Sequence, residues 1–336
     1  MCGTICFLTM FESLNNPEKA PRSILALDFG GTKLAAAIVA VGEREWRSHK
    51  RMLSPAQADA KTDLANMRSL IHDLLQGEKP AAIGVSFGGP VDAFLGKVRL
   101  SHHVPGWENI PLREILETEF QVPVSVDNDA NVAALGEHRF GAGIGYESLF
   151  YITVSTGVGG GLILNGHPWR GAEGMAGEIG HVVVDPNGPI CLCGKRGCVE
   201  RLASGPYMAA AAREELHKQP LRGEILRSLA NNNEDAITGQ LISQAATQGD
   251  ELALEILQRA GWALGVGIGN AANLINPQLF VLGGGVTKAG AQFWEVVRRV
   301  ARETALPEVN FDIVPAALGD EAPLWGAVAL AQEELN

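Results

Sequence analysis

Three of the five cysteines of this chain lie in one short stretch, CLCGKRGC (191–198), and His181 lies shortly before them. One imidazole and three thiolates form a ligand set that structural zinc accepts. Cys191 and Cys193 are too close for a relaxed disulfide, and the stretch has no C-x-x-C redox motif. The pattern favours a zinc site over free thiols or a redox role, with the ligands His181, Cys191, Cys193 and Cys198.

Two glycine-containing turns lie between apolar runs and predict β-hairpins. DFGGTK (28–33) follows the run 24–27, and STGVGGG (155–161) lies within the apolar stretch 148–166. Turns of this kind present consecutive backbone N–H groups that can bind an anion, although neither matches the P-loop or G-x-G-x-x-G patterns. Each turn alone could be only a structural hairpin, and the two could be unrelated. Together they indicate a duplicated architecture that holds a polyphosphate from two sides.

Asp129 lies in DNDAN (127–131), where an extended segment is expected to become a helix. It could simply cap that helix. Alternatively, it is a carboxylate at a helix N-terminus, whose dipole favours the ionised form. Such a group can accept the proton of a substrate hydroxyl as that oxygen attacks phosphorus. Positioning matters most in this reaction, so an ordinary pKa suffices. Asn128 offers a donor and an acceptor to a sugar hydroxyl.

Two glutamates flank the proposed zinc ligands. Glu178 lies in GEIGH (177–181), and Glu200 follows the last cysteine by two positions. A metal that fixes this segment would hold both carboxylates in place. Rigid carboxylates aimed at ring hydroxyls let a site reject analogues that lack those hydroxyls.

Apolar runs and amphipathic stretches alternate along the chain. This alternation predicts the α/β class, with a largely parallel sheet in each of two domains around a shared cleft. The expected strands lie at 24–27, 81–92, the start of 122–141, and 275–286. The expected helices lie at 62–76, 111–120, the end of 122–141, most of 206–262 with a polar break at 231–235, and 323–335.

Composition excludes several classes of protein. The net charge of −11 and the lack of a basic run argue against a nucleic-acid partner, and no apolar stretch is long enough to span a membrane. Residues 1–22 make a poor signal peptide and are expected to be a flexible extension or the product of an upstream start codon. An odd number of crowded cysteines fits a reducing, cytoplasmic location.

The motifs DFGGTK, VDNDANVAALGE, TVSTGVGGG, GEIGH and CLCGKRGCVE, in this order, resemble those of the ROK sugar kinases and repressors of the actin/hexokinase-like ATPase superfamily. The resemblance runs from about residue 23 to the C-terminus. It implies two ribonuclease-H-like α/β domains around an interdomain cleft, formed by 23–127 with 322–336 and by 128–321. It also implies a homodimer or homotetramer.

The resemblance further implies ATP with Mg²⁺ as cofactor and a hexose as substrate. Asp129 would be the catalytic base for the 6-hydroxyl, and Asp28 would position the Mg²⁺–phosphate. The sugar would be held by Asn128, Asp129, Glu178, His181 and Glu200, and His181 would also bind zinc. Phosphate would contact Gly30, Gly31, Thr32, Lys33, Thr156 and Gly157, while the adenosine would lie beside Gly283, Gly284, Gly285 and Val286.

The expected function is ATP-dependent phosphorylation of glucose to glucose 6-phosphate, because HHVPGWENIPL (102–112) resembles the family's glucokinases. SFGGPVD (86–92) departs from the common family wording G-x-x-P-G, which keeps N-acetylmannosamine, N-acetylglucosamine and fructose as alternative substrates. A sugar-responsive repressor is the remote alternative. Only 22 residues precede the first expected strand, and they are neither basic nor periodic. A non-catalytic sugar-binding protein is not favoured, because both turns and Asp129 are present.

Overall fold

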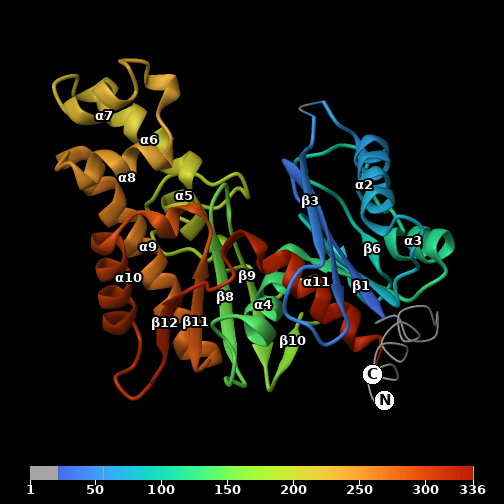
Figure 1. The fold of residues 1–336 in the computed structure, drawn as a ribbon. Helices are drawn as coiled ribbons and strands as arrows, with labels where there is room; N and C mark the ends of the chain where they lie inside the picture. The colour runs from blue at the N-terminus through green and yellow to red at the C-terminus, as the bar shows by residue number, and fades with distance from the viewer. Residues whose placement is uncertain (1–21, 56, 336) are drawn as a thin grey trace, which may run out of the picture.

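The computed structural model describes residues 22–55 and 57–335 (Figure 1). The expected extension over 1–22 therefore lies outside the described residues, except for Arg22. None of the helices in the described ranges is long and apolar enough to cross a membrane.

Two five-stranded sheets with the same strand order form the centre of the molecule. The first has the order β3-β2-β1-β4-β7, and the second β10-β9-β8-β11-β12, so the expected duplication is present. The bounds of the first set are β1 Ser23–Phe29, β2 Lys33–Ala40, β3 Ser48–Leu53, β4 Ala82–Phe87 and β7 Val124–Asn128. Those of the second are β8 Leu149–Val154, β9 Val158–Leu164, β10 His167–Trp169, β11 Leu279–Gly283 and β12 Asp312–Pro315.

Both predicted hairpins are present, because β1 pairs antiparallel with β2 and β8 pairs antiparallel with β9. The prediction of largely parallel sheets is wrong. In each sheet only two of the four strand pairings are parallel, those within β1-β4-β7 and within β8-β11-β12. The hairpin strands pair antiparallel, and so do the outer strands β3 and β10 with their neighbours. The two strands of a hairpin must run antiparallel, whereas parallel neighbours need a longer crossover connection, usually through a helix. A short ribbon, β5 (Val91–Asp92) with β6 (Lys97–Val98), follows β4.

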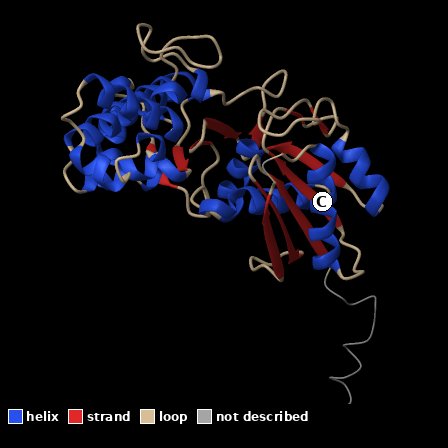
Figure 2. Cartoon of the chain, turned by 90° about the horizontal axis from the view of Figure 1, so that it is seen from above, coloured by secondary structure: helices blue, strands red, loops and turns tan. Residues whose placement is uncertain are grey.

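Helices cover both sheets and also separate them (Figures 1 and 2). Apolar side chains of α2 (Ala60–Leu75) and α3 (Leu112–Phe120) share a core with the first sheet. The second sheet shares its own core with a group of helices at the far side. These are α5 Val199–Ala203, α6 Gly205–Lys218, α7 Glu224–Leu229, α8 Gly239–Thr247, α9 Glu251–Ile275 and α10 Ala291–Thr304. The short helices η2 Ile179–His181, η3 Glu234–Ala236, η4 Gly285–Lys288 and η5 Gly319–Glu321 lie in connections.

A third core joins the two halves through α4 (Asp129–Phe140) and α11 (Ala322–Glu333). The two helices cross in close contact, since a Cβ on Gly326 would lie 1.7 Å from the carbonyl oxygen of Val132. Figure 1 shows α11 against the first sheet and α4 against the second. We propose the expected domain boundaries on this basis, with α11 assigned to the first lobe and α4 to the second.

Candidate active site

A cavity of about 480 Å³ lies between the two glycine turns, each of which follows the first strand of its sheet. It is lined by every residue predicted to hold the sugar and by parts of both predicted phosphate turns. These lining residues are Gly31, Thr32, Asn128, Asp129, Thr156, Gly157, Glu178, His181 and Glu200. Asp28, Gly30 and Lys33 do not line the cavity. Gly30 instead donates its N–H to the carbonyl of Lys33 and closes the hairpin turn.

The register of the first sheet brings acidic residues that are distant in the chain to the edge of the sheet beside Asn128 and Asp129. Asp28 on β1 pairs with Ser86 on β4, and Ser86 pairs with Asp127 on β7. These three strands are parallel, so their carboxyl ends meet at one edge of the sheet. The Ser86 hydroxyl donates a 2.8 Å hydrogen bond to Asp28 Oδ1.

Asp129 is the first residue of α4, and its neighbour caps the helix. The Asn128 side chain accepts hydrogen bonds from the backbone N–H groups of Ala130 (3.0 Å) and Asn131 (3.4 Å). The alternative that Asp129 is the cap is therefore wrong. Asn128 also donates to Asp129 Oδ1 (3.0 Å) and to the Gly89 carbonyl (3.1 Å). These contacts orient Asp129 and occupy the amide that was expected to bind sugar.

The pKa of Asp129 is above the ordinary value that would suffice for a base, although a helix dipole alone would favour the ionised form. Burial raises the pKa of the Asp129 carboxyl to about 7, and the negative charge of Asp28 adds to the rise. Hydrogen bonds from Ala130 and Asn128 oppose it. Burial also raises the pKa of Asp28, to about 6. Desolvation therefore outweighs the helix dipole at this position, and Asp129 becomes a base suited to neutral pH.

Two residues that support the cavity without lining it, Asp127 and Arg170, were not predicted from the sequence. Arg170 Nε lies 2.6 Å from Oδ2 of Asp127, a carboxylate that is 3% exposed. Asp127 Oδ1 accepts hydrogen bonds from the backbone of Asn128 (2.7 Å) and from the Asn131 amide (3.2 Å). Because Arg170 follows β10, it attaches the loop that leads to Glu178 to the start of α4. Asp127 could have been noticed as the first carboxylate of DNDAN, but no motif in the sequence marks its partner Arg170.

His102 and His103 also line the cavity. The ring of His103 packs against the first glycine turn, since a Cβ on Gly31 would lie 2.7 Å from its Cδ2 atom. Both belong to the stretch 102–112, which the sequence indicated only as a likeness and not as a part of the site.

Glu200 connects the cysteine cluster to the second glycine turn. It lies on α5, directly after Cys198 and Val199, and its Oε2 accepts a 3.0 Å hydrogen bond from the Val158 backbone. This contact leaves Oε1 available to a ligand. Glu178, in contrast, is exposed at the cavity wall.

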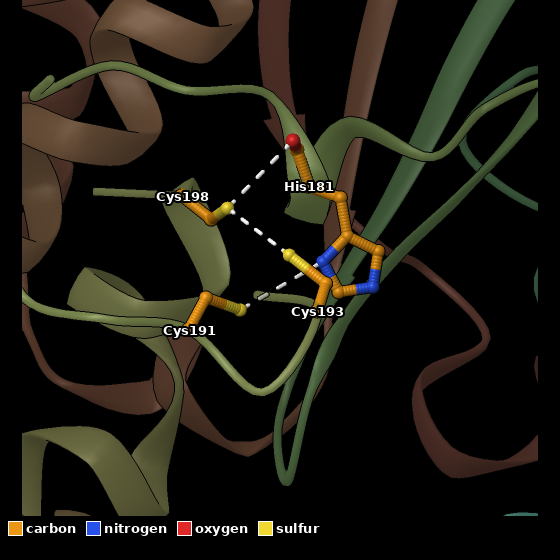
Figure 3. A group of neighbouring side chains, drawn as sticks. All are labelled: His181, Cys191, Cys193 and Cys198. Atoms are coloured by element: carbon orange, nitrogen blue, oxygen red, sulfur yellow. Dashed lines mark hydrogen bonds between the residues drawn. The ribbon is translucent and has the colours of Figure 1, made fainter. Parts of the chain in front are cut away.

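The structure brings His181 and the three cysteines together (Figure 3). Their ligand atoms all lie within 4.8 Å of one another, with 4.0 Å between Cys191 Sγ and His181 Nδ1 and 3.6 Å between the sulfurs of Cys193 and Cys198. A zinc tetrahedron with bonds of about 2.3 Å has edges of about 3.8 Å. The donor set and its spacing therefore fit zinc.

A second, larger cavity of about 1100 Å³ lies on the other side of Ser155 and Thr156, which line both cavities. Gly285 and Val286 line it, as expected for the predicted adenosine site. Gly283 and Gly284 do not. They shape the turn instead, because a Cβ on Gly284 would lie 2.4 Å from the Val154 carbonyl oxygen.

Comparisons with known proteins identify the family of this chain. The model of the ROK family matches residues 24–334. The chain belongs to the ROK family. The resemblance seen in the motifs is confirmed, and so is the fold expected from it, because solved ROK glucokinase and hexokinase structures superpose on this chain.

Three relatives show the range within this family. A glucokinase from Streptomyces coelicolor is 35% identical over 314 residues, covering 92% of this chain and 97% of its own. The crystal structure of a ROK family glucokinase from Streptomyces griseus, in complex with glucose and AMPPNP, is 33% identical with a TM-score of 0.79 and covers 93% of this chain and 99% of its own. A xylose repressor from Caldicellulosiruptor bescii is 32% identical over 75% of this chain and 63% of its own.

Proposed function

We propose that this ATP-dependent sugar kinase transfers the terminal phosphoryl group of ATP to the 6-hydroxyl of glucose and forms glucose 6-phosphate. The observation that carries the proposal is the position of Asp129, which lines a cavity between two glycine turns and has a pKa raised to about 7. The likeness to glucokinases over almost the whole chain supports glucose as the substrate.

The residues of the chain divide the chemistry between them. Asp129 accepts the proton of the sugar hydroxyl as its oxygen attacks the terminal phosphorus, while Glu178, His181 and Glu200 hold ring hydroxyls. The backbone N–H groups of the two turns bind the phosphates from opposite sides, with Thr32 on one turn and Thr156 on the other. Phosphoryl transfer depends mainly on such positioning and charge stabilisation.

Asp28 would hold Mg²⁺ near the phosphates. One oxygen of the Asp28 carboxylate accepts a hydrogen bond from Ser86, and the negative charge of Asp28 raises the pKa of Asp129. Magnesium keeps several waters and is bound through one or two carboxylates together with substrate phosphates, so this donor set fits it. When bound, the ion neutralises charge on the phosphates.

We propose that zinc bound by His181 and the three cysteines is structural. Four protein ligands leave no position open for a reactant. Binding of Nδ1 would leave Nε2 of His181 for a sugar hydroxyl. Burial raises the pKa of the Cys198 thiol to about 12, so a cation is needed to stabilise its thiolate.

The test is a coupled assay of ADP release with Mg²⁺, ATP and a panel of glucose, mannose, fructose, N-acetylmannosamine and N-acetylglucosamine. We expect the highest kcat/KM with glucose. Asp129→Asn should lower turnover by about 10²–10⁴-fold while the sugar still binds. No ADP release with any sugar would refute the kinase, and a different best sugar would refute only the choice of glucose.

A sugar-responsive repressor is the second candidate, favoured by the similarity to a xylose repressor. It predicts specific, sugar-dependent binding to an operator sequence in a gel-shift assay, and the kinase proposal predicts none. The cytoplasmic location and the homodimer or homotetramer remain predictions, which cell fractionation and light scattering of the purified protein address.

A further inference from the structure

The 1100 Å³ cavity is lined by apolar, cationic and uncharged polar residues. Its apolar surface is formed by Pro206, Ala209, Ile237, Val286 and Ala289. Among the residues 22–55 and 57–335, the charged ones that line it are the cations Arg213 and Lys288, with no carboxylate. Such a cavity, mostly uncharged and of the size of a small-molecule site, fits a flat apolar ring system joined to an anion.

One helix supplies most of the uncharged polar groups in this cavity. Gln240, Ser243, Gln244 and Thr247 of α8 all line it. Their spacing places them on one face of the helix. The opposite face carries the buried residues Ile242, Ala245 and Ala246, which fix α8 against the second core. The polar face is therefore held toward the cavity.

The two hydroxyls on this face are already bonded within the helix. Ser243 Oγ donates to the Gly239 carbonyl (3.0 Å), and Thr247 Oγ1 donates to the Ser243 carbonyl (2.9 Å). The carboxamides of Gln240 and Gln244 are exposed and form no hydrogen bond with any residue in the described part of the chain. They are therefore the groups on α8 that are free to bind a ligand.

We infer that Gln240 and Gln244 recognise the adenine base of the phosphoryl donor and make the enzyme selective for ATP over GTP. This inference rests on the proposed kinase function. A carboxamide offers one donor and one acceptor side by side, which matches N7 and the 6-amino group of adenine. Guanine presents two acceptors at the same edge, N7 and O6, so one of the two bonds is lost.

The two cavities share part of their lining, so one nucleotide can reach from the 1100 Å³ cavity to the cavity that contains Asp129. Ser155 and Thr156 line both cavities, so a nucleotide whose phosphates contact Thr156 can extend its base toward α8. The phosphates then lie between the base and Asp129. Lys288 and Arg213 would offset the negative charge of the nucleotide phosphates locally, although the whole chain carries a net charge of −11.

The experiment compares ATP and GTP as donors in three proteins, which are the unaltered chain, Gln240→Ala/Gln244→Ala and Gln248→Ala. Gln248 is an exposed glutamine at the end of α8 that does not line the cavity, so it is the matched control. Binding of each nucleotide is also measured by calorimetry, using the Asp129→Asn background. Circular dichroism checks that α8 remains folded.

We expect the unaltered chain and the Gln248 variant to prefer ATP over GTP by about tenfold or more in both kcat/KM and affinity. The double variant should lose most of this preference, mainly through weaker ATP binding, while kcat at saturating ATP stays within about threefold. Equal use of ATP and GTP by the unaltered chain, or an unchanged preference in the folded double variant, would overturn the inference. Absence of turnover with intact, Gln-dependent ATP selectivity in calorimetry would instead refute the proposed kinase function alone.

Discussion

Arg170 and Asp127 form an ion pair that joins the two halves of the molecule beside the candidate active site. Asp127 lies one residue before the end of β7 in the first sheet, and Arg170 follows β10 of the second, with 2.6 Å between Arg170 Nε and Asp127 Oδ2. Asp127 also holds the backbone of Asn128, the cap of the helix that begins with Asp129. The pair thus connects the orientation of the base to the loop that leads to Glu178.

Arg170→Met should raise KM for the sugar by about tenfold and leave KM for ATP within about twofold. It should also lower the free energy of unfolding by roughly 1–3 kcal/mol, because a buried carboxylate loses its charged partner. Steady-state kinetics and urea denaturation measure the two effects. Arg139→Met, at an exposed position on α4, is the control. Equal changes in both KM values would contradict a role in positioning the sugar loop.

Activity should depend on the protonation of Asp129. Burial and Asp28 raise its pKa to about 7, so the basic form accumulates only as pH rises through that value. We expect kcat/KM for the sugar, at saturating MgATP, to increase between about pH 6 and 8 and then level off. The residual activity of Asp129→Asn should lack this rise. A profile that is flat from pH 5.5 to 8.5 would remove Asp129 as the titrating base.

The same raised pKa predicts that Asp129 destabilises the fold at neutral pH. The folded protein binds this proton more tightly than the unfolded chain, so stability from this group is present at low pH. It is lost as pH rises from about 4 to about 7. Asp129→Asn should therefore be more stable than the unaltered chain at pH 8, by on the order of 1 kcal/mol, with a smaller gain at pH 5. Asp312→Asn, at an exposed position on β12, should show no such difference.

The cysteine cluster should contain about one zinc per chain. Cys193→Ser removes an exposed ligand and should lower the bound zinc, measured by plasma mass spectrometry, to near zero. KM for the sugar should rise, because His181 and the segment between Glu178 and Glu200 lose their common anchor. Cys6→Ser, at a cysteine that lies outside the stretch CLCGKRGC, should leave both values unchanged. Fully active protein that contains no zinc would contradict this prediction.

The two glutamates of the sugar site should differ in their effects. Glu200 holds the Val158 backbone in the second glycine turn, whereas Glu178 has no such contact in the described hydrogen bonds. Glu200→Ala should therefore raise KM for both sugar and ATP, and Glu178→Ala should raise KM for the sugar only. The pair serves as its own control, because the substitutions are chemically identical. A Glu200 variant with an unchanged KM for ATP would show that the turn does not depend on this contact.

The elements that the sequence predicted best are those with strong apolar patterns. The hairpin at 23–41, the strand-to-helix segment at 122–141 and the C-terminal helix are present with nearly the expected bounds. The edge strand β3, SHKRML, is mostly exposed and polar, so it lacks the apolar alternation that reveals a strand. The strands β10 and β12 lie at the two edges of the second sheet, and both are short, as edge strands often are.

The residues of the site were predicted better than their properties. The motifs and the family resemblance named several of the residues that line the cavity beside Asp129, but not His102 or His103. The ligand set of the cysteine cluster came from residue types alone. The raised pKa of Asp129 could not be predicted, because it arises from burial and from Asp28, a residue about 100 positions away in the chain. The partner of Asp127 also comes from a different sheet, so no local pattern indicates it.

Because the turn at 155–158 contacts Glu200 on one side and borders the donor cavity on the other, occupancy of either ligand site should stiffen a segment that the other also uses. Thermodynamic reciprocity then requires each ligand to tighten the other by the same factor. The enzyme without a bound sugar would then hold ATP less tightly, which would limit the transfer of the phosphoryl group to water.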